Sequence, residues 1–106
     1  MIDISSLQAR ISEFAQRRDW EQFHNPKNLA MALSAEVGEL VEIFQWLTLE
    51  QAASVMADAD TAAAVMDECA DVLIYLARLA DVLGLDLLAA ANAKIDRNEV
   101  RFPYSG

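Results

Sequence analysis

The sequence is poor in residues that interrupt helices. Its 106 residues include only three glycines and two prolines, while alanine and leucine are abundant. This composition favours helices over strands. No alternating strand pattern, glycine-rich phosphate loop or internal repeat occurs, so we expect an all-α fold.

Cysteine and positive charge are also scarce. The single cysteine, Cys69, excludes an internal disulfide framework and fits a reducing compartment. Eight Lys and Arg residues stand against 17 Asp and Glu residues, which gives a net charge of −9. Because no basic stripe is present to neutralise phosphates, the charge argues against a nucleic-acid polymer as a partner, and we expect none. A bound cation would relieve part of the negative charge.

Long apolar runs are absent as well. No stretch reaches the roughly 18 residues that cross a membrane, and the opening "MIDISSLQARISEF" lacks the basic start and apolar stretch of a leader. We therefore expect a soluble, cytoplasmic protein without a membrane partner. Yet 55% of the residues are hydrophobic, more than the interior of so small a monomer hides. We expect residues 1–106 to form one domain whose core is completed by subunit association.

Apolar residues recur at helical spacing through most of the chain. Asn25 followed by Pro26 is a strong helix start. Thr48 with Gln51 resembles a capping box, and Gly84 is a natural helix stop. The expected helices cover residues 4–18, 26–47, 49–57, 61–83 and, after a cap at Asp86, 87–100.

Carboxylates interrupt the apolar face of the second expected helix, in "LSAEVGELVEIFQW". At about 100° per residue, Glu36 and Glu39 lie among the leucines and isoleucines of that face. Glu42 lies roughly 120° from Glu36, toward the edge of the face, where we expect it to be partly solvated. Gly38, between the first two glutamates, leaves room for a backbone, ligand or metal to approach.

The fourth expected helix repeats this arrangement in "MDECADVLIYLARL". Glu68 shares its angle with apolar positions, and Asp71 flanks it one turn later. Asp67 lies to one side, near Arg78, as a surface residue. Two helices therefore each carry an acidic pair three residues apart on an otherwise apolar stripe.

A buried carboxylate without a partner costs several kcal/mol, and few Lys or Arg residues lie on these faces. Antiparallel packing of the two helices would instead form a cluster of four carboxylates. Hard divalent cations such as Mg²⁺ or Mn²⁺ prefer such oxygen ligands. Iron and zinc fit less well, because His24 is the only histidine. A solvated surface remains the alternative for either pair taken alone.

The residues also resemble a known family. "EVGELVEIFQW" and "DECADVLIYLARL" are similar to the paired acidic motifs of the MazG-type all-α nucleoside triphosphate pyrophosphohydrolases, and "RDWEQFHNPKNLAMAL" and "NAKIDRNEVRFP" resemble its dCTP pyrophosphatase-like branch. The resemblance implies a MazG-like helical bundle and cleavage of a dNTP between its α and β phosphates, for house-cleaning or control of the nucleotide pool. It implies homodimers, commonly paired into homotetramers. The implied magnesium ligands are Glu36, Glu39, Glu68 and Asp71.

Further residues are candidates for water activation and substrate binding. Glu39 is the first candidate for activating water and Glu42 the second. Phosphate contacts are expected from Lys27, Lys94 and Asn98, with a solvated charged face as the alternative. Stacking on the base is expected from Trp20, Trp46 and Tyr75, with core packing as the alternative. His24 contacts substrate or merely shapes the entry to the second helix.

Two other functions stay open from the sequence. One is a non-catalytic helical module that binds nucleotide for regulation, and the other is hydrolysis of a different pyrophosphate nucleotide, such as phosphoribosyl-ATP. The base is open as well, because Ile11 stands where the branch resemblance implies a histidine in the base pocket. Cytosine, adenine and modified pyrimidines all remain candidates.

Overall fold

The computed structural model describes residues 2–105, which contain helices and no strand. Two of the seven segments are short 3₁₀ helices, η1 and η2. The all-α prediction is therefore confirmed for the described chain. In order, the elements are α1 (Ile4–Arg17), η1 (Glu21–Phe23), α2 (Pro26–Phe44), α3 (Leu49–Ala53), η2 (Val55–Ala57), α4 (Ala59–Leu83) and α5 (Leu87–Arg101).

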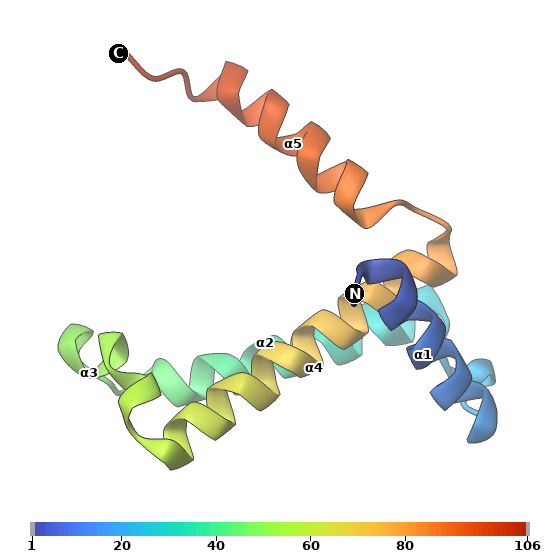
Figure 1. Cartoon of the computed structure of the whole chain (residues 1–106), viewed down its shortest axis with the longest axis horizontal. Helices are drawn as coiled ribbons and strands as arrows, with labels where there is room; N and C mark the ends of the chain where they lie inside the picture. The colour runs from blue at the N-terminus through green and yellow to red at the C-terminus, as the bar shows by residue number, and fades with distance from the viewer. Residues whose placement is uncertain (1, 106) are drawn as a thin grey trace.

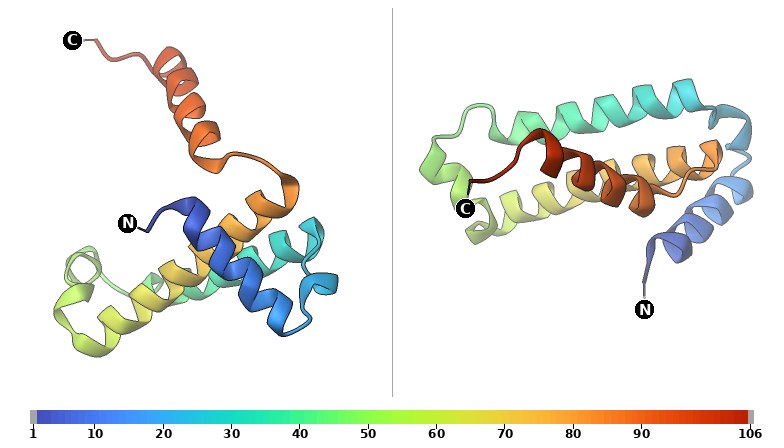
Figure 2. Two further views of the ribbon diagram at one scale, coloured as in Figure 1. Left: turned by 45° about the vertical axis from the view of Figure 1, so that its right-hand side comes forward. Right: turned by 90° about the horizontal axis from the view of Figure 1, so that it is seen from above.

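The centre of the molecule is an antiparallel pair of long helices, α2 and α4 (Figure 1). The short α3 and η2 connect them at one end. At the other end α1 lies across α4 (Figure 2), and the Gln8 side-chain amide donates to the Ala77 carbonyl at 2.9 Å. This arrangement turns the acidic face of α2 toward the acidic face of α4.

Helix starts follow the capping residues of the sequence. The Asn25 side chain accepts from the Asn28 amide at the start of α2, and Thr48 and Gln51 form the expected capping box at α3. Helix α4 begins at Ala59, two residues before the predicted start. The reason is that the Asp58 carboxylate accepts from the Thr61 amide at 3.0 Å and so caps the helix earlier.

Helix ends differ more from the prediction. Helix α2 ends at Phe44 instead of continuing to residue 47, because Thr48 needs extended backbone (ψ 167°) to cap the next helix. Helix α3 is five residues long, and η2 covers the remainder of the predicted third helix. Trp46, which the expected helix 26–47 includes, therefore lies in a turn beyond α2.

The end of α1 directs the chain sharply toward η1. The Trp20 amide donates to the Ala15 carbonyl at 2.9 Å and the Asp19 amide donates to the Gln16 carbonyl at 3.1 Å. These two bonds, with Asp19 in the left-handed region at φ 56°, form a Schellman motif. The turn packs the Trp20 ring edge-on against the Phe14 ring, with centroids 5.6 Å apart.

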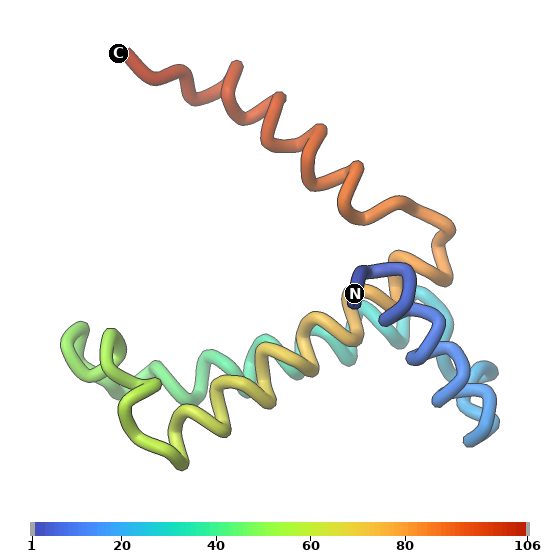
Figure 3. The backbone as a smooth tube through the Cα atoms, viewed as in Figure 1, coloured from blue at the N-terminus to red at the C-terminus, as the bar shows by residue number. Residues whose placement is uncertain are grey.

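The core of the described chain is small. Its buried hydrophobic residues are Ala15, Leu29, Ala62, Ala77 and Ala80, so Leu29 is the one large side chain among them. Helix α5 projects away from the other helices (Figures 1 and 3), and the radius of gyration is 16.8 Å, against about 13 Å for a compact domain of this length. Within residues 2–105, no helix is long and apolar enough to cross a membrane.

Candidate functional site

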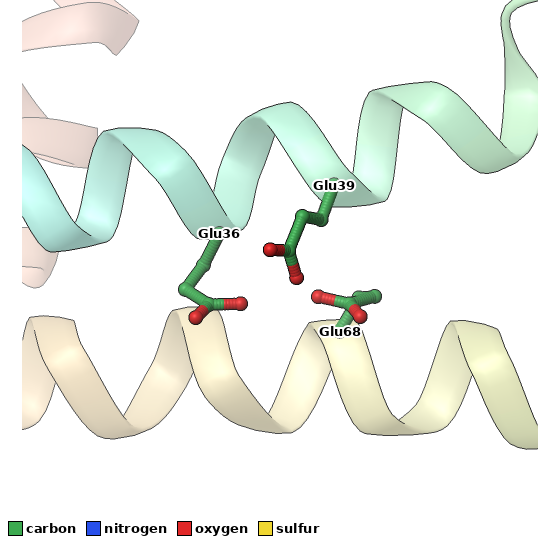
Figure 4. Close-up of side chains that lie close together, drawn as sticks. All are labelled: Glu36, Glu39 and Glu68. Atoms are coloured by element: carbon green, nitrogen blue, oxygen red, sulfur yellow. The ribbon is translucent and has the colours of Figure 1, made fainter.

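Three glutamates meet between α2 and α4. Glu36 and Glu39 reach down from α2, and Glu68 reaches up from α4 (Figure 4). One carboxylate oxygen from each lies within 4.8 Å of the others. The i, i+3 spacing on α2 and the antiparallel course of α4 produce this cluster.

The cluster leaves two carboxylate oxygens without partners. Oε2 of Glu36 and Oε2 of Glu68 are both shielded from solvent and accept no hydrogen bond. The ion pairs found among residues 2–105 join Arg17 to Glu13 and Arg78 to Asp81, and neither reaches the cluster. An all-oxygen donor set with unpaired, shielded atoms fits a hard divalent cation.

The proton affinity of the cluster reflects the same crowding. Removal from water, followed by hydrogen bonding to Glu39 and the charges of Glu39 and Glu36, raises the pKa of Glu68 to about 7. The pKa of Glu36 is raised as well, first by removal from water and then by the negative charges of Glu39 and Asp71. Both carboxylates therefore lack a positive neighbour.

Asp71 and Glu42 lie outside this group of three. Asp71 follows Glu68 by one turn of α4 and is half-buried. Its charge acts on Glu36, which places it near the cluster. Glu42 is exposed and, like the exposed Asp67, belongs to the helix surface. The structure thus brings together three of the four predicted metal ligands and keeps the fourth close by.

The η1 turn forms a second group of predicted site residues. Trp20 remains 43% exposed, and the His24 ring lies 6.4 Å from the Trp20 ring between centroids. The Nε–H of Arg78 donates to Nδ1 of His24 at 3.1 Å. Arg78 is only 7% exposed, although the sequence pattern placed it at the side of α4. A lone arginine inside the apolar run "YLARLADVL" was the available signal.

An apolar hollow lies beside this aromatic group. It has a volume of about 320 Å³ and is bounded by residues of α1 and α4. Ile11, where a histidine was implied by the resemblance, is part of its wall. The lining residues are Leu7, Arg10, Ile11, Phe14 and Ile74.

The remaining predicted substrate contacts are dispersed. Tyr75 is half-buried on α4, one turn after Asp71, and Trp46 is 86% exposed in the turn after α2. Lys27 is exposed in the first turn of α2. Lys94 and Asn98 lie on α5, which projects away from the α2 and α4 pair (Figure 2). Within one chain, the lysines are therefore not gathered around the glutamates.

Comparisons with known proteins agree with this architecture. Residues 31–105 match the model of the MazG-like family. The chain is 48% identical to human dCTP pyrophosphatase 1 and 46% identical to the bovine protein of that name, in each case over 101 residues. These alignments cover 95% of the chain but 58% of each relative. The chain thus spans little more than half the length of these relatives.

A solved structure is similar over nearly its whole length. The crystal structure of a pyrophosphatase from Archaeoglobus fulgidus superimposes with a TM-score of 0.89 at 37% identity. The match covers 98% of this chain and 95% of that one.

Proposed function

The chain belongs to the MazG-like family, and from this premise we propose that it is a nucleoside triphosphate pyrophosphohydrolase. It would cleave the α–β phosphoanhydride of a dNTP, dCTP or a related nucleotide including dATP, to give the dNMP and pyrophosphate. The observation that carries this proposal is the glutamate cluster, with two shielded carboxylate oxygens that have no partner. The names of the relatives and of the similar crystal structure support it.

We propose that the cluster holds Mg²⁺, with Mn²⁺ as a possible substitute. Glu36, Glu39 and Glu68 supply the oxygen ligands, and Asp71 completes the set. When bound, such an ion neutralises phosphate charge and orients the phosphate chain for in-line attack. The donor set supports a hard cation, because it offers oxygen and no nitrogen or sulfur.

One carboxylate must orient the attacking water and accept its proton. Glu39 is our first choice, since it lies inside the cluster and is more exposed than Glu36 or Glu68. Glu42 is the second choice, because it is exposed on the following turn of α2. A group acting as base must be within hydrogen-bond reach of the water, a condition that favours Glu39.

The aromatic residues would hold the base. Trp20 has an exposed ring beside the apolar hollow, and its neighbour His24 offers a hydrogen bond. Tyr75 lies one turn beyond Asp71, and the exposed Trp46 would offer a second ring for stacking on the base. Ile11 makes one wall of the hollow apolar, which disfavours recognition that depends on a polar side chain at this position.

Lysine and asparagine side chains would hold the phosphates. Lys27 lies in the first turn of α2, where free backbone amides also favour phosphate. Lys94 and Asn98 lie on the projecting α5 and would approach a glutamate cluster from a second copy of the chain. We therefore propose that the site is completed by self-association into a homodimer or homotetramer.

The exposed surface supports self-association. The chain exposes 8063 Å², whereas a compact monomer of 106 residues would expose about 5,900 Å². The excess of about 2,000 Å² is comparable to what one partner buries in an extensive dimer. Exposed apolar side chains on α5 include Leu88, Ile95 and Val100.

The decisive test is pyrophosphate release from a panel of dNTPs, 5-substituted dCTPs and phosphoribosyl-ATP, with and without Mg²⁺. We expect Glu36→Gln and Glu68→Gln to abolish turnover with helical content unchanged by circular dichroism. Asp67→Asn removes the same charge from the exposed face of α4 and should retain turnover. Activity that survives either glutamate change would disprove the assigned ligands.

The same panel separates the proposal from its non-catalytic alternative. A regulatory nucleotide-binding module would bind a non-hydrolysable dNTP by calorimetry but release no pyrophosphate from any nucleotide. That result would show nucleotide binding without hydrolysis and would contradict the proposed activity. We expect turnover of at least one dNTP, with a cytoplasmic location as predicted from the sequence.

A further inference from the structure

Arg78 is a buried charge that the proposed reaction does not use. It lies in the last two turns of α4, and 7% of its surface is exposed. Its Nε–H donates to Nδ1 of His24 at 3.1 Å. Its Nη1 lies 3.6 Å from Oδ2 of Asp81, whose side chain is 41% exposed. Burying a guanidinium is costly unless hydrogen bonds and a nearby opposite charge compensate it, and His24 and Asp81 are the partners found here.

The contact fixes the chemistry of the histidine. Arginine keeps its protons at any ordinary pH, so its Nε can only donate. The Nδ1 atom of His24 must therefore present a lone pair, and the single proton of the neutral ring must sit on Nε2. A proton on Nδ1 would set one N–H against another.

The surroundings of the ring also mainly favour its neutral form. Partial burial, followed by the positive charge of Arg78, lowers the pKa of His24, while Glu21 on η1 opposes this shift. Asp81, 3.6 Å from Nη1 of Arg78, offsets part of the guanidinium charge. Burial and the Arg78 charge therefore both favour the neutral imidazole over the charged form.

The backbone also fixes the ring beside Trp20. The His24 amide donates to the Glu21 carbonyl at 3.1 Å, and the Asn28 side-chain amide donates to the Phe23 carbonyl at 3.1 Å. The two rings are 6.4 Å apart with planes inclined at 57°. A nucleotide stacked on Trp20 would thus lie within reach of the ring.

We propose that Arg78 is a positioning residue that holds His24 as a neutral imidazole protonated on Nε2, so that this N–H donates to an oxygen acceptor of the bound nucleotide. The ligand in this inference rests on the proposed function. The tautomer does not, because it follows from the contact with Arg78 alone. A purely structural arginine would tie η1 to α4 without controlling the imidazole.

The first test uses the fact that the chain has one histidine. ¹⁵N chemical shifts of the His24 ring in the full chain report the tautomer, and their pH titration reports the pKa. We expect the Nε2–H tautomer and a pKa below 6.5 in the unmodified protein. Arg78→Met should mix the tautomers and raise the pKa toward 6.5. Arg78→Lys retains a cationic donor and should preserve the Nε2–H form.

The outcome that overturns the assignment is equally direct. A wild-type ring protonated mainly on Nδ1, or titrating at or above 6.5, would exclude the proposed role. The measurement on the wild-type ring needs no variant, so it decides the assignment even if Arg78→Met does not fold.

The second test separates substrate binding from turnover. We expect Arg78→Met to raise KM for the hydrolysed dNTP by roughly three- to tenfold, the worth of one hydrogen bond, with kcat changed less than about twofold. In a His24→Ala background the same change should add nothing to KM. Arg17→Met, a change at an exposed ion pair on α1, is the matched control and should leave both constants unchanged.

The two tests fail in distinguishable ways. If no nucleotide is hydrolysed, the proposed function is wrong, while the ring shifts still decide the Arg78 assignment. If hydrolysis proceeds and Arg78→Met raises KM equally with and without His24, Arg78 does not act through the histidine.

Discussion

Among the described residues, Glu68 is the side chain with the largest pKa shift. Its pKa is raised from 4.5 to about 7 in the folded chain, so the folded state binds this proton more tightly than the unfolded state. The protonated form therefore contributes stability that is fully present below pH 4.5 and is lost as the pH rises through about 7. The metal-free protein should be least stable in the upper part of this range.

This linkage gives a measurable slope. In the presence of a chelator, we expect the free energy of unfolding to fall between pH 4.5 and about 7, and Glu68→Gln to flatten that fall because the neutral amide cannot ionise. Urea titrations at several pH values measure this slope of the free energy of unfolding. Asp67→Asn, on the exposed side of α4, should keep the wild-type slope. Equal slopes for wild type and Glu68→Gln would contradict the prediction.

At the scale of single residues, much of the candidate site could be predicted from the sequence. Glu36, Glu39 and Glu68 could be placed on facing helices because angular position on a helix follows directly from residue spacing. The place of Arg78 in an apolar run was a signal but did not settle its burial, since an arginine on an apolar stripe often extends its charged end to water. Its partner His24 is 54 residues away, and no local pattern joins them.

Among the helices, the starts were more predictable than the ends. Asn25, Thr48 and Asp86 cap helices as expected, because a capping side chain bonds to an amide only three residues away. The end of α2 depends instead on competition with the cap of the following helix. The expected range of 26–47 therefore included Trp46, which lies beyond the end of α2 at Phe44.

Two glycines allow the helical elements to be tested in opposite directions. Gly84 ends α4 at φ 69°, a conformation that costs a residue with a Cβ about 1 kcal/mol. Gly38 lies within α2, and a Cβ there would meet nothing within 4 Å. We expect Gly84→Ala to lower the free energy of unfolding by about 1 kcal/mol, and Gly38→Ala to raise it by up to about 1 kcal/mol.

Chemical denaturation of both variants at one protein concentration provides the measurement. Each glycine is the control for the other, because both changes add a single methyl group. A loss of stability in Gly38→Ala would contradict the prediction and show that a molecule outside the chain packs against α2.

At the scale of the whole molecule, the chain is open and extended. Its radius of gyration and exposed area both exceed those of a compact domain, and within residues 2–105 Leu29 is the one large, fully buried side chain. The sequence indicated this surplus through its hydrophobic content. It could not indicate which helix would be left without a partner, since α5 has the same amphipathic pattern as a packed helix.

Helix α5 is therefore the place to test self-association. We expect the wild-type chain to sediment as a dimer or tetramer and Ile95→Glu to shift it toward monomer, with at least about a tenfold weaker association. Ile95 is 55% exposed in the isolated chain. The neighbouring Asp96→Asn is the control and should leave the sedimentation unchanged. A monomeric wild type at every concentration would contradict the prediction.

The projecting α5 has a consequence for genetics. If Lys94 serves the glutamate cluster of a second chain, the carboxylates and the lysine of one working site are encoded on different polypeptides. Chains carrying Glu36→Gln and chains carrying Lys94→Ala, each inactive alone, should then complement each other when co-expressed. Random pairing would restore about a quarter of the sites, and pyrophosphate release from the mixture would measure it. Two defective alleles in one cell would together supply the activity that neither supplies alone.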